Sequence, residues 1–213
     1  MEIRILDGAL QVPDLLDGQL HLKALHAVEY DDFDRDALRV FCHRHARYGL
    51  PTIELVHWLE SRIRNRSAIE IGSGAGDLAH FLAIRATDNR MQEWPTIRSH
   101  YLLAGQPVIQ YPDFVEKFDA LDAIAHYKPD VVVASWVTQW VDPNQPPPEA
   151  GGNAWGVKED EILETGCTYI LVGNKHVHGQ KKIMREPHQE FELPFLRSRA
   201  TYPHLDRVWV WGD

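Results

Sequence analysis

The sequence has few cysteines, no basic excess and no long apolar run. Its two cysteines, Cys42 and Cys167, lack the spacing of a metal or redox motif, so we expect free thiols in a cytoplasmic protein. No apolar segment approaches the roughly 20 residues of a membrane span. The first residues, MEIRILDGALQVPD, lack the basic start and apolar centre of a signal peptide. These absences argue against a secreted, disulfide-stabilised or membrane-spanning protein.

The charge balance bears on the partners. The net charge is −9, whereas proteins that bind nucleic acid over a broad surface usually carry a basic excess. Residues 175–185 are the one locally basic stretch. We therefore expect a small-molecule or protein substrate and disfavour a large nucleic acid.

The most informative stretch that is present is Ser67–Asp88. It opens with an apolar run, Ala68–Ile71, which is typical of a buried parallel strand. The residues from Asp77 to Leu82 can begin a helix. A strand, a glycine turn and a helix together let a nucleotide-like ligand approach bare backbone. The turn has glycines at alternate positions: Gly72, Gly74 and Gly76.

The spacing of the turn is E-x-G-x-G-x-G, from Glu70 to Gly76. Dinucleotide-binding turns usually read G-x-G-x-x-G instead. The observed pattern resembles the first motif of the class I S-adenosylmethionine-dependent methyltransferases. The resemblance covers roughly residues 67–172. It implies a three-layer, Rossmann-like α/β fold with a mostly parallel sheet, helices on both faces and S-adenosyl-L-methionine as cofactor.

The resemblance also implies roles for particular residues. Glu70 would lie near the methionine end of the cofactor, and Asp88 would accept hydrogen bonds from the ribose hydroxyls. Asp113 would bind the adenine amino group or, alternatively, cap a helix. Met91 would pack beneath the adenosine or, alternatively, in the core. The full set of implied cofactor contacts is Glu70, Gly72, Ser73, Gly74, Gly76, Asp88, Met91, Asp113, Ser135 and Trp136.

The clearest central strand is Val131–Trp136, which is short, apolar and β-branched. In doubly wound sheets the ligand lies beyond the carboxyl ends of the strands, so we expect the reactive methyl group to be faced by Ser135, Trp136, Thr138 and Gln139. DNA amino-methyltransferases often carry N/D/S-P-P-Y/F/W at this place. The sequence here lacks the double proline, so base methylation of that type is disfavoured.

Two later segments offer further candidates. His176 could act as a general base, because its reference pKa suits that task. His176 and His178 could also bind a metal, but no third ligand is suitably spaced, and a solvated pair is the simpler interpretation. The loop Asp142–Gly152 is either a flap over the site or a passive surface loop, and the flanking Trp140 and Trp155 could line a substrate pocket.

We expect one domain over residues 1–213, with an N-terminal arm and lid helices in 1–66 and a Rossmann-like core in 67–213. Tyr48 and Glu54 are candidates for the lid, although an aromatic in the core and an exposed glutamate are the plainer alternatives. The short gap between Gly76 and Asp88 limits the first core helix to about two turns. The expected helices are Asp34–Tyr48, Ile53–Ile63, Phe114–Tyr127, Val157–Thr165 and Pro194–Arg199, and the expected strands are Ala68–Ile71, Ile84–Thr87, Val108–Tyr111, Val131–Trp136, Thr168–Val172 and Arg207–Trp211.

Because one strand follows the fifth where the resembled fold usually has two, the C-terminal part looks abbreviated. Methyl transfer to a small molecule or protein is the leading hypothesis. One alternative is a regulatory protein that binds the cofactor without catalysis, which the clipped first helix and the short C-terminal part motivate. The other is an enzyme that cleaves the cofactor.

Overall fold

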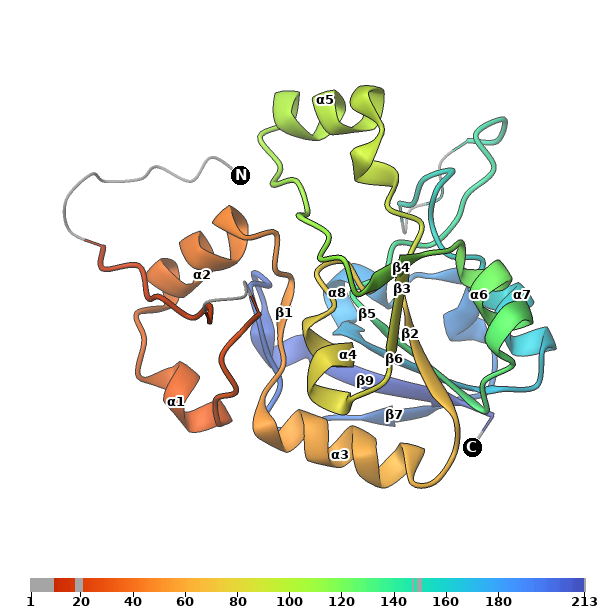
Figure 1. Cartoon of the computed structure of the whole chain (residues 1–213), viewed down its shortest axis with the longest axis horizontal. Helices are drawn as coiled ribbons and strands as arrows, with labels where there is room; N and C mark the ends of the chain where they lie inside the picture. Colours follow the sequence, from red (N-terminus) through yellow and green to blue (C-terminus); the bar gives the residue numbers. More distant parts are fainter. Residues whose placement is uncertain (1–9, 18–20, 147, 149–150, 213) are drawn as a thin grey trace.

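The structure is a computed structural model that describes residues 10–17, 21–146, 148 and 151–212. None of its described helices is long and apolar enough to cross a bilayer. Figure 1 shows the order of the elements. In chain order they are α1 (Ala27–Asp31), α2 (Arg35–Arg44), β1 (Gly49–Leu50), α3 (Ile53–Ile63), β2 (Ala68–Ile71), α4 (Asp77–Leu82), β3 (Arg85–Asp88), η1 (Met91–Glu93), α5 (Pro95–Leu103), β4 (Val115–Lys117), α6 (Ala120–Tyr127), β5 (Val131–Ser135), α7 (Glu159–Glu164), β6 (Thr168–Asn174), α8 (Lys175–His178), η2 (Lys182–Arg185), β7 (Gln189–Phe191), β8 (Arg197–Ser198), η3 (Pro203–Leu205) and β9 (Asp206–Trp211).

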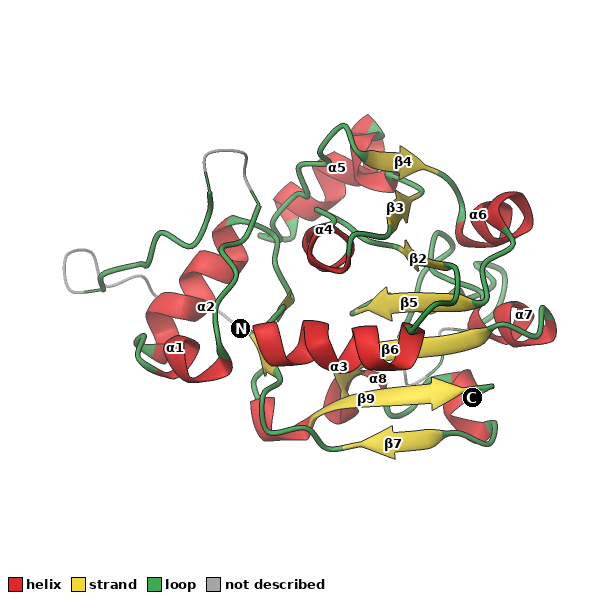
Figure 2. Ribbon diagram, turned by 60° about the horizontal axis from the view of Figure 1, so that its bottom comes forward, coloured by secondary structure: helices red, strands yellow, loops and turns green. Residues whose placement is uncertain are grey.

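A seven-stranded sheet forms the centre of the molecule, in the order β4-β3-β2-β5-β6-β9-β7 (Figure 2). Strands β2 to β6 are parallel, and β9 runs antiparallel to both of its neighbours. The first five strands therefore follow the Rossmann order, whose switch point lies between β2 and β5. The predicted α/β class with a mostly parallel sheet is confirmed.

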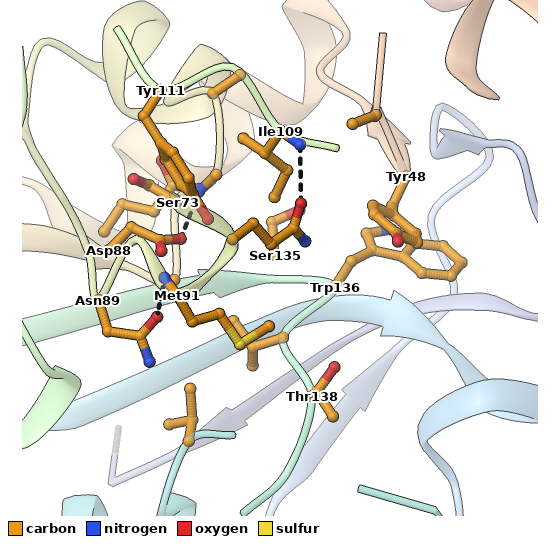
Figure 3. Close-up of a pocket in the computed structure, with 18 of the residues that line it drawn as sticks. Tyr48, Ser73, Asp88, Asn89, Met91, Ile109, Tyr111, Ser135, Trp136 and Thr138 are labelled. Carbon is orange, nitrogen blue, oxygen red and sulfur yellow. Dashed lines mark hydrogen bonds between the residues drawn. The ribbon is translucent and has the colours of Figure 1, made fainter. Parts of the chain in front are cut away.

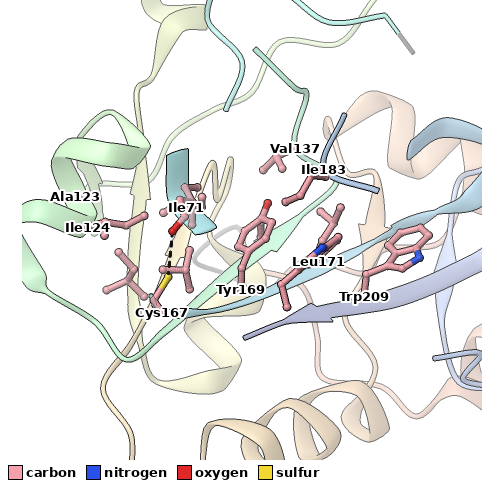
Figure 4. Close-up of a cluster of buried hydrophobic side chains, with 14 residues drawn as sticks. Ile71, Ala123, Ile124, Val137, Cys167, Tyr169, Leu171, Ile183 and Trp209 are labelled. Atoms are coloured by element: carbon pink, nitrogen blue, oxygen red, sulfur yellow. Dashed lines mark hydrogen bonds between the residues drawn. The ribbon is translucent and has the colours of Figure 1, made fainter. Parts of the chain in front are cut away.

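Helices cover both faces of this sheet because its central strands are apolar on both sides. Val131 and Val133 of β5 pack in one cluster with side chains of α3 and α4. Val132 and Ala134, which point the other way, pack with side chains of α6 and α7 (Figure 4). This alternation makes the three layers.

The C-terminal part supplies two strands of the sheet after β6, contrary to the expectation of one. Both β7 and β9 follow β6 in the chain, and in the sheet β9 lies between β6 and β7. Strand β7 is three residues long and largely exposed, so it has no apolar pattern to reveal it. The predicted helix Pro194–Arg199 is also wrong, because Arg197–Ser198 pairs with β1 as a strand.

In the N-terminal region, α1 and α2 precede α3, which spans the predicted residues Ile53–Ile63. The Thr52 hydroxyl accepts a hydrogen bond from the Leu55 N–H and caps this helix. The preceding helix ends at Arg44, four residues before its predicted end. The bidentate ion pair between Arg197 and Asp31 joins this region to the C-terminal segment.

The segment between β3 and β4 departs most from expectation. Helix α5 stands out above the sheet there (Figure 1). Val108–Tyr111 is not a strand: prolines flank it, and the Ile109 N–H donates to the Gln92 side chain at 2.8 Å instead of to a neighbouring strand. The third strand of the parallel set is β4, and the predicted helix from Phe114 begins six residues later, at Ala120.

Candidate functional site

A cavity of about 200 Å³ opens at the carboxyl ends of β2, β3 and β5. Figure 3 shows Asp88 and Tyr111 on one side of it and Tyr48 and Trp136 on the other. We call these sides the glycine-turn end and the Trp136 end. The predicted site residues that line the cavity are Glu70, Gly72, Ser73, Gly74, Asp88, Met91, Ser135 and Trp136, whereas Gly76, Asp113 and His176 do not line it.

All three glycines of the turn have left-handed backbone angles, with φ between 55° and 73°. Side chains rarely adopt this region, which is why glycine is required. A Cβ on Gly72 would meet Val137 at 2.7 Å, and one on Gly76 would meet Phe114 at 2.8 Å. A Cβ on Gly74 would make only an ordinary contact, with Ile109 at 3.5 Å. Gly72 and Gly76 therefore permit close packing, and Gly74 presents bare backbone to the cavity.

The amide groups of the turn are bonded within the protein. The N–H of Ser73 donates to Thr87 O at 3.0 Å, and the N–H of Gly76 donates to Ser73 O at 2.8 Å. The N–H of Gly74 donates to Asp88 Oδ2 at 2.9 Å. Phosphate sites need such amides to point at the ligand. This turn does not offer these three amides to a phosphate.

Carboxylates dominate the glycine-turn end. Glu70 is 2% exposed and accepts a hydrogen bond from the Ala79 N–H at 2.8 Å. Burial raises the pKa of Glu70 to about 8. Burial also raises the pKa of Asp88, although its bonds from the N–H groups of Gly74 and Arg90 oppose the shift. The positive charge of Arg90 also opposes the shift at Asp88, although burial outweighs it.

The third acid at this end is not Asp113, the residue predicted to follow the third parallel strand. Asp113 is exposed and precedes β4, so it is not the acid that follows the third strand. That position belongs to Asp119, which lines the cavity and caps α6 by accepting from the Leu121 N–H at 3.2 Å. The error follows from the misplaced strand, since the rule of an acid at the strand end holds once β4 is located.

The fourth acid, Asp77, is neutralised by its own partner. Arg47 Nε lies 2.5 Å from Asp77 Oδ2, and both side chains are nearly buried. Arg47 comes from the N-terminal region, so this ion pair fixes that region over the start of α4. Of the described residues that line the cavity, four are acids and Arg47 is the one lysine or arginine.

The Trp136 end combines segments that are distant in sequence. Trp136 follows β5 and has a left-handed φ of 59°, which is a genuine outlier for a bulky residue. Tyr48 lies nearly parallel to it, with ring centroids 6.3 Å apart and planes inclined by 28°. Tyr48 thus lines the cavity as the lid interpretation predicts, whereas Glu54 pairs with His26 and does not line it.

His176 is exposed and contacts Tyr202, so the structure does not bring it to the cavity. His178 is buried instead, and its ring packs edge-on against Trp136 at 5.2 Å. Burial lowers the pKa of His178 to about 3, so it is neutral at physiological pH. Among the described residues, no three His, Cys, Asp or Glu side chains are grouped to share a metal.

Other cavity residues were not foreseen or were foreseen in part. Trp155 lines the cavity and Trp140 does not, while residues 147, 149 and 150 of the adjoining loop lie outside the described part of the chain. Arg47 and the strap between α5 and β4, residues 104–114, belong to no sequence motif, because they reach the site through tertiary contacts. Helix α5 contributes Tyr101, and the strap contributes Ile109 and Tyr111.

The sequence matches no family model, and no curated protein matches it. Two similar solved structures are a ribosomal protein L11 methylase from Lactobacillus delbrueckii subsp. bulgaricus and a protein from Thermoplasma acidophilum. The first is 13% identical over 74% of this chain and 77% of its own, with a TM-score of 0.31. The second is 15% identical over 83% of this chain and 94% of its own, also with a TM-score of 0.31. At these scores, the strand order of this chain is the firmer description of its fold.

Proposed function

We propose that this protein binds S-adenosyl-L-methionine and transfers its methyl group to a small-molecule or protein acceptor. The observation that carries the proposal is the charge of the cavity. Four acids line it, one of them paired with Arg47, and three amides of the glycine turn are already bonded. A pyrophosphate would face carboxylates without those donors, whereas a sulfonium and an ammonium group gain from them.

Particular residues fit the parts of this cofactor. Ser73 Oγ is buried with no hydrogen-bond partner among the described residues, on the turn that lines the cavity. A ligand hydroxyl or carboxylate would satisfy it. Asp88 and Asp119 follow adjacent strands and would take the ribose and adenine groups, and Glu70 would face the cationic end. Met91 lines the same end and would pack on the adenosine.

When bound, the cofactor supplies a methyl group that an acceptor lone pair can take, while the C–S electron pair stays with sulfur and any acceptor proton passes to water. The task of the chain is to hold the acceptor in line and to exclude water. Ser135, Trp136 and Thr138 stand where the acceptor would lie, at the end of β5.

Two alternative functions are a protein that binds the cofactor without catalysis and an enzyme that cleaves it. The presence of β7 and β9 after β6 removes the short C-terminal part as a reason to expect a non-catalytic protein, whereas the first core helix, α4, is short, at six residues. No described feature of the cavity favours cleavage of the cofactor over transfer.

The test uses methyl-labelled S-adenosylmethionine with fractionated cell extract. Wild-type protein should move label into one small-molecule or protein fraction. Gly72→Ala should abolish this, because its Cβ would collide with Val137. Gly105→Ala is the matched control: it has the same left-handed backbone, with φ +63°, but open space around it, and it should keep full activity. Label loss without any methylated acceptor would identify cleavage, and binding without turnover would identify a non-catalytic protein.

A further inference from the structure

The Trp136 end of the cavity has a specific shape that the general proposal leaves unexplained. Tyr48 and Trp136 present two nearly parallel rings, and their 6.3 Å centroid separation is near the upper limit for rings that pair directly. Both rings line the cavity, beside the glycine turn. At this separation the two rings pair with each other and leave no gap for a third ring, so together they present one aromatic surface to the cavity. A flat ring packs on such a surface better than a bulky group does.

Trp136 is held in place at a conformational cost. The left-handed region is unfavourable for a bulky residue, and such strain is concentrated at ligand sites. The backbone N–H of Trp136 donates to Val172 O at 2.9 Å. Gly49 makes room for the indole, because a Cβ there would lie 2.9 Å from Trp136 Nε1. The His178 ring also packs against the indole, with planes inclined by 75°.

A buried ion pair fixes the next residue. Lys181 Nζ donates to Val137 O at 2.8 Å and pairs with Glu159 at 2.8 Å. The Tyr169 hydroxyl donates to the same carboxylate at 2.8 Å. Lys181 and Glu159 are each 3% exposed. The turn that carries Trp136 is therefore anchored, through Val137, by the buried hydrogen-bond network of Lys181, Glu159 and Tyr169.

Tyr48 is fixed from the other side. The Arg199 guanidinium lies 3.8 Å from the centroid of the Tyr48 ring. The backbone N–H of Arg199 donates to the backbone carbonyl oxygen of Tyr48 at 3.0 Å. Strand β1, which follows Tyr48, pairs with β8. The positive charge of Arg199 beside this ring makes a second cation unfavourable there. The site therefore suits an uncharged ring better than an ammonium group.

We propose that Trp136 and Tyr48 form the acceptor subsite, and that it takes a flat, uncharged aromatic ring. The proposal rests on the methyl transfer proposed above, for which it names the acceptor class. The aliphatic ammonium group of a lysine side chain has neither the flat shape nor the charge that this surface favours. With a net charge of −9, the free ring compound is a better fit than a ring carried on a nucleic acid.

The test compares two uncharged probes that share a skeleton, flat 2-naphthol and saturated decahydro-2-naphthol. S-adenosylhomocysteine binding is measured first by calorimetry, and saturating S-adenosylhomocysteine then fills the glycine-turn end. The readout is the ¹⁹F spectrum of 5-fluorotryptophan-labelled protein, with the Trp136 resonance assigned from Trp136→Phe. We expect 2-naphthol to shift that resonance and to bind roughly tenfold more tightly than its saturated counterpart.

Variants locate the effect. Trp136→Leu and Tyr48→Leu should each bring the affinity ratio close to one, while Trp140→Leu, outside the cavity, should keep it; for the leucine variants the ratio is measured by calorimetry. If one of the leucine variants fails to fold, the other carries the test. The cation 2-naphthylmethylamine should bind less tightly than 2-naphthol.

Equal binding of the flat and saturated probes, a ratio that survives in the folded leucine variants, or a preference for the amine would overturn the proposal. The probes can also be titrated without S-adenosylhomocysteine. A protein that fails to bind S-adenosylhomocysteine but keeps the flat-ring preference would refute the methyl-transfer function alone, which separates the two failures.

Discussion

The two ends of the cavity are built in different ways. The glycine-turn end comes from consecutive strand ends, with Glu70, Gly74, Asp88 and Asp119 all lying between residues 70 and 119. The Trp136 end joins Tyr48 of the N-terminal region to Trp136 after β5, and is held by Arg199 and Lys181. The first end follows from local backbone geometry. The second depends on contacts between distant segments, so it can be disturbed without touching the first.

The largest expected effect concerns the buried anchor of the Trp136 end. Lys181→Met should lower the free energy of unfolding by about 3–5 kcal/mol, because it leaves Glu159 charged and unpaired in the interior. Lys182→Met is the matched control, since the neighbouring lysine pairs with Asp160 at the surface, and it should lose less than about 1 kcal/mol. Urea unfolding measures both.

A second variant separates charge from packing at the same place. Lys181→Met combined with Glu159→Gln should regain part of the lost stability, because no lone charge remains buried. Equal losses for the two single lysine variants would show that the anchor is not needed.

The next effect tests which acid follows the third parallel strand. Asp119→Ala should weaken S-adenosylmethionine binding by about tenfold or more, as expected for the loss of a hydrogen bond to a charged group. Asp113→Ala should leave the dissociation constant unchanged, because Asp113 lies outside the cavity. Calorimetry on both variants decides between them, and a larger loss for Asp113→Ala would reverse our assignment.

A pH series probes the glycine-turn end alone. The pKa of Glu70 is about 8, so the carboxyl is protonated at pH 6 in the free protein. A cationic ligand prefers the ionised form, and binding then releases a proton. The affinity for S-adenosylmethionine should therefore rise by up to about tenfold per pH unit from pH 6 and level off above pH 8.

Glu70→Gln is the control for that series. The glutamine oxygen can still accept from the Ala79 N–H, and its side chain does not titrate. The slope should disappear in this variant, and a slope that persisted would have to come from another group.

The smallest effect concerns the surface clamp between the N-terminal region and the C-terminal segment. Asp31→Asn removes the charge that pairs with Arg197. Because Asp31 is 56% exposed, we expect less than about 1 kcal/mol of lost stability in thermal unfolding. Calorimetric binding of S-adenosylhomocysteine should be unchanged, and a loss there would mean that the two ends are coupled.

More of the glycine-turn end than of the Trp136 end could be predicted from the sequence, for physical reasons. Gly72, Gly74 and Gly76 adopt left-handed backbone angles, which the alternating glycines of the sequence already indicate. The third strand was misplaced because Val108–Tyr111 has strand-forming residues, yet its Ile109 N–H is taken by Gln92. A side-chain contact 17 residues away overrode local propensity there.

The Trp136 end was foreseen only in part. Ser135 and Trp136 follow a strand that the pattern located, and Tyr48 was a candidate of equal standing with Glu54. In the structure Tyr48 lines the cavity, whereas Glu54 pairs with His26. Strand β1, which follows Tyr48, pairs with β8, and both have two residues, too few to show a pattern. His176 was chosen for its chemistry, but α8 directs it away and buries His178 instead.

The most direct test of the cavity's charge is the dissociation constant of S-adenosylmethionine set against that of NAD, both measured by isothermal titration calorimetry at pH 8. We predict that S-adenosylmethionine binds at least a hundredfold more tightly, because carboxylates line the cavity and repel a pyrophosphate. Equal or tighter binding of NAD would contradict the account.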